Sequence, residues 1–306
     1  MTAARHVSLI GAPTDVGAGA RGASMGPEAL RVAGLAEALR AHGVEVKDCG
    51  NLTGPSNPWQ PPTAGYRHLD EVTAWNQAVH DAVYAELGAG RMPILLGGDH
   101  CLGLGSITAV ARHCRKTGRQ LRVLWLDAHA DFNTHTVTPS GNVHGMPVAC
   151  LCGLGPDALT KLGGEAPAMR PDEIRQIGIR SVDEGEKRLV QEYGLDVYDM
   201  RYIDEIGMKR VMEEALEGVD DNTHLHVSFD VDFLDPSIAP GVGTTVPGGP
   251  NYREAQLVME MIADTGRMAS LDIVELNPII DKRNRTARLA VDLVESLFGK
   301  STLMRD

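Results

Sequence analysis

Three side chains that could bind a metal alternate with alanine in the stretch WLDAHADFNT, residues 125–134. Residues i and i+2 of an extended chain lie on the same side. Asp127, His129 and Asp131 therefore point together wherever the backbone stays extended. The stretch is either a polar strand end that faces solvent or part of a metal site, and partners elsewhere in the chain decide between the two.

Three other apolar runs end in, or are followed by, the same kinds of side chain. These are Asp99 and His100 after ILLGG, Asp230 and Asp232 after HVSF, and Glu275 in LDIVEL. Taken singly, each has an ordinary explanation. Asp99 precedes a predicted helix and suits a cap, and Asp235 precedes a proline and suits a turn. His100 alone is typical of a loop histidine.

Carboxylates gathered at one place repel one another unless a cation neutralises them. Imidazole combined with carboxylate suits Mn, Zn, Fe or Co better than Ca, and the excess of carboxylates favours Mn over Zn. Two such metals can share one water and lower its pKa, which makes hydroxide available at neutral pH. The joint occurrence of these motifs at strand ends predicts a site for two metals.

Short apolar runs alternate with helical patterns along the whole chain. We expect strands at 6–11, 44–48, 93–98, 121–127, 173–179, 195–199, 224–230 and 269–276. We expect helices from near Pro27, around Val72 to Val83, and at 101–113, 184–193, 203–218, 252–265 and 284–298. This alternation predicts an α/β fold with a mainly parallel central sheet, as one domain over residues 1–306. In such sheets ligands bind outside the carboxyl ends of the strands, where the acidic motifs lie.

The bulk composition disfavours several classes of partner. The net charge is −12, which disfavours nucleic acid and anionic membrane surfaces. The first residues lack a signal-peptide pattern, and no run of 18 apolar residues occurs. We therefore expect a cytoplasmic protein with neither a nucleic-acid nor a membrane partner. Its five cysteines are expected to be reduced.

The motifs together resemble the ureohydrolase family, and its arginase branch most closely. The resemblance begins with GAPTDVGAGARGASMGPEALRVAGL (11–35) and continues through LGGDH, DAHAD, SGNVHGMP, SFDVDFLDP and VELNP. These motifs occur in the family's order over nearly the whole chain. The resemblance implies a three-layer α/β/α fold around the parallel sheet, assembled as a homotrimer or homohexamer.

The resemblance also implies two Mn²⁺ per subunit. The ligands carried over to this chain are His100, Asp127, His129, Asp131, Asp230 and Asp232. His100 and Asp131 would complete one metal site, and His129 and Asp232 the other. Asp127 and Asp230 would bridge the two metals.

The implied activity is that of a hydrolase acting on C–N bonds in linear amidines, which converts L-arginine and water to L-ornithine and urea. A metal-bridging hydroxide would be the nucleophile, oriented by Asp131. Glu275 would pair with the planar guanidinium, and His144 would shuttle a proton to the leaving amine. The alternative for Glu275 is a salt bridge to Arg283 or Arg285.

Recognition of the amino-acid end of the substrate is implied for five further residues: Asn133, Ser140, Asn142, Asp183 and Thr244. Asn133, Ser140 and Asn142 offer donors to an α-carboxylate, and Asp183 an acceptor to the α-amino group. Glu186 could support Asp183 or act as a helix N-terminal acid. The pattern S-G-N-x-H-G favours arginine over agmatine as the substrate.

Two alternatives to this function remain. Another amidinohydrolase, such as an agmatinase or a guanidinobutyrase, would share the metal motifs. A non-catalytic metal-binding regulator would retain the fold alone. The chain also departs from the family pattern at Cys101, Ala130 and Phe233, and its Pro-rich loop at 50–65 has no predicted role beyond that of a surface or interface loop.

Overall fold

The computed structural model describes residues 6–303. Within them, eight strands form a single sheet in which every pairing is parallel. The strands are β1 (His6–Ala12), β2 (Glu45–Asn51), β3 (Met92–Gly97), β4 (Gln120–Leu126), β5 (Ile174–Ile179), β6 (Asp196–Asp199), β7 (Thr223–Asp230) and β8 (Met268–Val274). All eight predicted strands are confirmed. Their order across the sheet is β2-β1-β3-β8-β7-β4-β5-β6.

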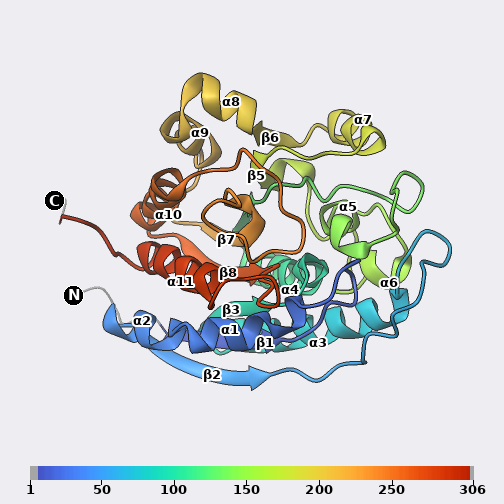
Figure 1. Cartoon of the computed structure of the whole chain (residues 1–306), viewed down its shortest axis with the longest axis horizontal. Coiled ribbons are helices and arrows are strands. Elements are labelled where there is room, and N and C mark those ends of the chain that lie inside the picture. Colours follow the sequence, from blue (N-terminus) through green and yellow to red (C-terminus); the bar gives the residue numbers. More distant parts are fainter. Residues whose placement is uncertain (1–5, 304–306) are drawn as a thin grey trace.

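Helices cover both faces of the sheet, which gives the three layers visible in Figure 1. One face carries α1 (Gly26–Val32), α2 (Leu35–Ala41), α8 (Met200–Ile206), α9 (Met208–Ala215), α10 (Tyr252–Thr265) and α11 (Arg285–Leu297). The other carries α3 (Leu69–Gly88), α4 (Gly103–Thr117), α5 (Pro147–Leu151), α6 (Asp157–Thr160) and α7 (Glu184–Tyr193). The three-layer prediction is confirmed, whereas the single-domain organisation over 1–306 stays a prediction.

The helix predicted at 203–218 is wrong in its extent. The structure has two helices there, α8 and α9, which meet at Gly207 with φ 84° and ψ 146°. That conformation is open to glycine and interrupts the helical hydrogen bonds. The short helices α2, α5 and α6 were not predicted, because four to seven residues show little periodicity.

Alternation along the strands divides the core between the two faces. In β4, Leu124 and Leu126 face the α10–α11 side, and Val123 and Trp125 face the α4 side. Strand β7 differs from this pattern. Its apolar residues all face the α10–α11 side, while the four residues on the other side are buried and polar: His224, His226, Ser228 and Asp230. A polar row therefore runs along β7 to its carboxyl end.

The strand order explains why the acidic motifs meet. The four strands that precede them, β3, β8, β7 and β4, are consecutive neighbours at the centre of the sheet. Because all four are parallel, their carboxyl ends lie at one edge. No helix among residues 6–303 is long and apolar enough to cross a membrane.

Candidate metal centre and substrate pocket

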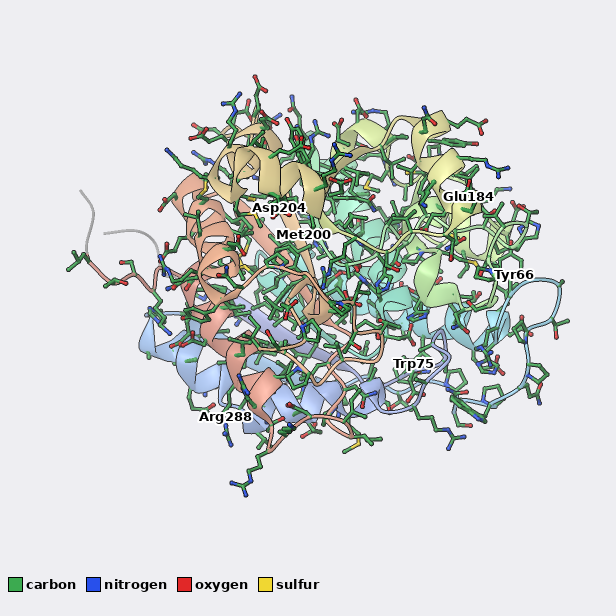
Figure 2. The ribbon with its side chains drawn as sticks, turned by 45° about the horizontal axis from the view of Figure 1, so that its top comes forward. Tyr66, Trp75, Glu184, Met200, Asp204 and Arg288 are labelled. Carbon is green, nitrogen blue, oxygen red and sulfur yellow. The ribbon has the colours of Figure 1, made fainter. Side chains whose placement is uncertain are left out.

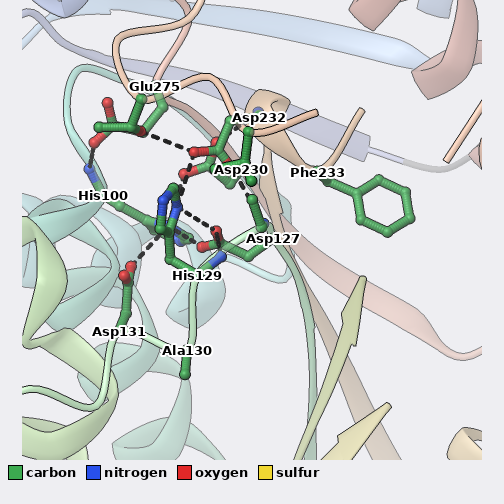
Figure 3. A network of polar contacts seen from close by, with 12 residues as sticks. His100, Asp127, His129, Ala130, Asp131, Asp230, Asp232, Phe233 and Glu275 are labelled. Atoms are coloured by element: carbon green, nitrogen blue, oxygen red, sulfur yellow. Dashed lines mark hydrogen bonds and ion pairs between the residues drawn. The ribbon is translucent and has the colours of Figure 1, made fainter. Parts of the chain in front are cut away.

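Two groups of possible metal ligands lie side by side at this edge. One contains His100, Asp127 and Asp230, and the other contains Asp127, His129 and Asp232. Within each group the candidate ligand atoms lie within 4.8 Å of one another. Figure 3 shows both imidazoles among the carboxylates, with Asp127 belonging to the two groups.

We call the group of His100, Asp127 and Asp230 the inner group. Its carboxylates converge on the imidazole of His100. Its Nδ1 lies 2.9 Å from Oδ2 of Asp127, 3.1 Å from Oδ2 of Asp230 and 3.3 Å from Oδ2 of Asp131. This nitrogen is buried, yet it forms no aligned hydrogen bond with any of them. A buried nitrogen that faces three carboxylate oxygens without a hydrogen bond fits a cation held between them.

The other side of the His100 ring contacts Ser228 and Trp125. Nε2 lies 2.8 Å from Oγ of Ser228, and the ring stacks on Trp125 at 3.9 Å between centroids. When Nε2–H donates to the serine, the lone pair of Nδ1 faces the carboxylates, as metal binding requires. Sequence reasoning missed Ser228, although its place two residues before Asp230 on the polar face of β7 was a usable signal.

We call the group of Asp127, His129 and Asp232 the outer group. Its carboxylates converge on the imidazole of His129. Its Nδ1 lies 3.4 Å from Oδ1 of Asp127 and 3.1 Å from Oδ2 of Asp232. Asp232 is held by the backbone N–H of Ala128 and by the hydroxyl of Thr244, at 3.0 and 2.9 Å. The side chain of His129 is 26% exposed, against 1% for His100. His129 is therefore the more exposed of the two imidazoles.

The electrostatics of the cluster require a balancing charge. Burial and the charge of Asp127 raise the pKa of Asp131 well above its usual value, and burial and Asp232 do the same to the pKa of Asp230. Burial opposes charge on the histidines, but Asp127 raises the pKa of His100 to about 9 and Asp232 that of His129 to about 12. Without metal, the cluster must retain protons to neutralise itself, and divalent cations would replace them.

Glu275 and His144 form a pair beside the inner group. Oε1 of Glu275 accepts hydrogen bonds from the backbone N–H of His100 at 2.8 Å and from Nδ1 of His144 at 3.0 Å. The salt bridge to Arg283 or Arg285, considered as an alternative, is not formed. Burial opposes the charge of Glu275, but His144 lowers its pKa, and Glu275 raises the pKa of His144 in return. Oε2 of Glu275 has no hydrogen-bond partner among the described residues and is free for a ligand.

Two of these residues have unusual backbones. Asp131 has φ 49° and Glu275 has φ 62°, in the left-handed region that non-glycine residues rarely adopt. Such a conformation costs on the order of 1 to 2 kcal/mol and persists where the surrounding structure imposes it. Both residues turn their chains sharply just beyond a strand, which directs their carboxylates back toward the cluster.

A pocket opens above the metal centre. Its lining includes all eight residues predicted for catalysis or substrate binding: Asp131, Asn133, Ser140, Asn142, His144, Asp183, Thr244 and Glu275. Of the predicted metal ligands it includes His100, His129, Asp131 and Asp230, whereas Asp127 and Asp232 lie beneath the surface. Four lining residues were not predicted to contact substrate: Thr138, Gly145, Ser181 and Glu186. Thr138 was missed because NTHTVTPS contains several hydroxyls with nothing to distinguish one.

The start of α7 supports one side of the pocket. Asp183 accepts a hydrogen bond from Nδ2 of Asn133 at 3.0 Å. Glu186 accepts from the backbone N–H groups of Asp183 and Phe132, at 3.1 and 2.8 Å. The prediction of Glu186 as a helix N-terminal acid is confirmed, and its second bond ties α7 to the segment that carries Asp131.

Residues outside the pattern have structural roles. Asp99 accepts from the N–H of Cys101 and Asp235 from that of Ser237, so the predicted cap and turn are confirmed. Phe233 is buried and points away from the cluster in Figure 3. A Cβ at Gly178 would lie 2.5 Å from its ring, so that glycine makes room for Phe233.

Known proteins resemble this chain over nearly its full length. The model of the Arginase family matches residues 5–299. Arginase from Brucella melitensis is 47% identical, with 98% of each chain covered. The structure of arginase from Bacillus caldovelox is 43% identical, with a TM-score of 0.91 over 98% of this chain and 100% of that one. Arginase from Entamoeba histolytica, solved with L-ornithine, is 33% identical, with a TM-score of 0.89 over 97% and 99%. This chain therefore belongs to the arginase family.

Proposed function

We propose that this protein hydrolyses L-arginine to L-ornithine and urea at a centre of two Mn²⁺ per subunit. The observation that carries the proposal is the position of Asp127, whose Oδ2 faces His100 and whose Oδ1 faces His129. Because Asp127 belongs to both ligand groups, it would hold both ions of a metal pair. The choice of L-arginine as the substrate rests on the relatives, which are named arginase.

The donor set fits divalent metals with affinity for oxygen and imidazole. His100 and Asp131 would hold one ion, and His129 and Asp232 would hold the other. Asp127 and Asp230 would contact both ions. Asp230 falls in the inner ligand group alone, so its bridging role rests on family resemblance. When bound, such a pair supplies the Lewis acidity that makes water a nucleophile at neutral pH.

The chain's own groups direct the reaction. Asp131 orients the attacking water by accepting its hydrogen bond. Oε2 of Glu275 pairs with the guanidinium and places its carbon next to the water. Water adds to that carbon and gives up both of its protons, and the bond from the carbon to the side-chain nitrogen breaks. The nitrogen takes up the two protons and leaves as an ammonium group, with urea as the other product. His144 delivers one of these protons from Nε2, because Nδ1 is engaged by Glu275.

Recognition of the amino-acid end distinguishes arginine from agmatine. Asn133, Ser140 and Asn142 line one side of the pocket. Ser140 and Asn142 offer donors to an α-carboxylate, and the NH₂ group of Asn133 has one hydrogen left beyond the bond that it donates to Asp183. Asp183 and Thr244 also line it, with the Asp183 carboxylate available to an α-amino group. Agmatine has no carboxylate and would leave the donors unpaired, which favours arginine.

The proposal extends to the protein's assembly and location. We propose a cytoplasmic homotrimer or homohexamer, in keeping with the family resemblance. Ile279 and Ile280 follow the Glu275 segment and are large, exposed apolar residues that would suit the core of a subunit interface. Light scattering on the purified protein measures the subunit number.

The test is a comparison of substrates. Purified protein supplied with Mn²⁺ is expected to release urea from L-arginine with a kcat/KM far above that for agmatine. Good turnover of agmatine with negligible turnover of arginine would replace the proposal by an agmatinase. No urea from either substrate, with less than one metal per chain, would favour a non-catalytic protein.

A further inference from the structure

The Pro-rich loop at 50–65, together with Tyr66 and Arg67 that follow it, packs on the segment that forms the substrate side of the pocket, residues 133–144. A Cβ at Gly141 would lie 2.6 Å from Pro62, so the two segments touch at that glycine. The hydroxyl of Tyr66 lies 2.8 Å from Nδ1 of His135, and the two rings stack. Figure 2 places Tyr66 on the same side of the molecule as Glu184 at the start of α7.

Arg67, two residues after this loop, reaches the pocket lining. Its backbone N–H donates to the carbonyl of Gly141 at 2.8 Å. Its Nε–H donates to Oδ1 of Asn142 at 2.7 Å, and its Nη1 donates to the carbonyl of Gln60 at 2.9 Å. The guanidinium is half-buried and is fixed from both sides.

The bond to Asn142 decides which end of its carboxamide is free. A carboxamide has an accepting oxygen and a donating NH₂ group, and either can face a ligand. Because Arg67 occupies the oxygen, the NH₂ group remains, and it makes no hydrogen bond to any described residue. Gly19 leaves space beside it, since a Cβ there would lie 2.7 Å from Nδ2. Asn142 is thus oriented as a donor.

The charge of Arg67 matters in this setting. The pocket lining includes the carboxylates of Asp131, Asp183, Glu186, Asp230 and Glu275, and none of its described residues is a lysine or an arginine. An anionic ligand group needs donors and a nearby positive charge to enter such a pocket. Asn142 supplies a donor at the end of the pocket where Ser140 also lies, and Arg67 places its positive charge directly behind Asn142.

We infer that Arg67 is a positioning residue that determines specificity, by holding Asn142 with its NH₂ group toward the α-carboxylate of the substrate. The inference rests on the proposed function and names a residue outside the metal centre that selects amino-acid substrates over amines. A ligand without a carboxylate gains nothing from this arrangement. If Arg67 only stabilised the structure of this region, it would affect the binding of both classes of ligand equally.

The experiment compares Arg67→Met with Arg67→Lys and with the control Arg21→Met. Arg21 stacks its guanidinium over Trp59 of the same loop, at 4.5 Å, without touching Asn142. On the Mn²⁺-loaded protein, Arg67→Met is expected to raise KM for L-arginine about tenfold with kcat nearly unchanged, the usual effect of losing one hydrogen bond to a charged group. Arg67→Lys keeps a charged donor and recovers most of the loss, and Arg21→Met leaves KM unchanged.

Binding measurements separate this inference from the proposed function. Calorimetry is expected to show a Kd for L-ornithine about tenfold higher in Arg67→Met, with that for putrescine, the same diamine without its carboxylate, unchanged. Equal weakening of both ligands, or of neither, would overturn the role of Arg67. Urea release by the unaltered protein tests the proposed function independently, because calorimetry needs no turnover.

A double variant tests whether Arg67 acts through Asn142. Since residues that work as a unit are not additive, Arg67→Met combined with Asn142→Ala is expected to bind L-ornithine no more weakly than Asn142→Ala alone. Full additivity of the two losses would show that Arg67 acts independently and would contradict the inference. The melting temperature of each variant confirms that it is folded.

Discussion

The metal centre and the substrate segment 133–144 lie next to each other but are held in different ways. The metal centre stands at the ends of four neighbouring parallel strands, and its carboxylates are fixed by nearby backbone: Asp127 accepts from the N–H of His129 at 2.6 Å, and Asp230 from that of Asp232 at 2.7 Å. The substrate segment lies beyond the strands. Its position depends on Arg67, on Gly17, whose carbonyl accepts from the N–H of His144, and on the start of α7.

Because they are held differently, the metal centre and the substrate segment suit different tasks. A strand end within a parallel sheet is a rigid place for groups that must keep an arrangement accurate to fractions of an ångström. A loop held by distant contacts can change its shape with few consequences for the sheet. We expect substitutions in the metal centre to abolish the reaction, and substitutions around the loop to change which ligand is accepted.

The largest effect is expected from Asp127→Ala. It removes the carboxylate common to both ligand groups, so bound metal and activity should fall together, activity by at least about a thousandfold if metals contribute several kcal/mol. Metal analysis and urea release from L-arginine measure the two losses. Asp235→Asn, which alters a turn carboxylate nearby, is the control and should retain its metal. Full activity of Asp127→Ala would disprove the bridging assignment.

His144→Ala tests whether a residue of the substrate segment can be changed without affecting the metal centre. Its imidazole lines the pocket but is absent from both ligand groups, so metal content should stay unchanged while kcat falls about a hundredfold or more, as for loss of a general acid. Metal analysis and steady-state kinetics on the same preparation separate the two effects. An unchanged kcat would remove His144 from the proton transfer.

Ser228→Ala tests how the inner ligand group is oriented. Without the hydroxyl, the tautomer of His100 is no longer fixed, and metal affinity is expected to fall about 10- to 100-fold. Ser270→Ala is a matched control, since Ser270 is buried on the neighbouring strand β8 and bonds His224 and His226 instead. Titration of metal-free protein with Mn²⁺ measures the affinity. Equal losses in the two variants would indicate a general effect of altering the polar row.

Thr244→Val is expected to have the smallest effect. The change keeps the shape and deletes one hydrogen bond to Oδ2 of Asp232, which at about 1 kcal/mol predicts a roughly fivefold loss of metal affinity at the outer group. The same Mn²⁺ titration detects it. A loss as large as that of Asp127→Ala would mean that the segment of Thr244, which lies outside the strands, shapes the metal centre more than the strands do.

The ease of predicting the two regions from sequence followed the same difference. The acidic and imidazole groups at the strand ends were found from a local pattern, an apolar strand followed by alternating polar residues, and the family resemblance supplied the full set of six proposed ligands. The parallel sheet predicted that these strand ends share one edge, but the adjacency of β3, β8, β7 and β4 is not local and was not predicted. Ser228 and Arg67 were missed because each acts by contacting a residue more than 70 positions away. Helices α8 and α9 were joined in error because Gly207 alone marked the break.

We propose that this edge of the sheet holds a metal pair that arginine hydrolysis requires. The most direct test is to remove metal with a chelator, return Mn²⁺ in steps, and follow bound metal and urea release from L-arginine together. We predict no urea from the metal-free protein and activity that saturates at two ions per chain. Full urea release with less than one ion per chain would contradict the account.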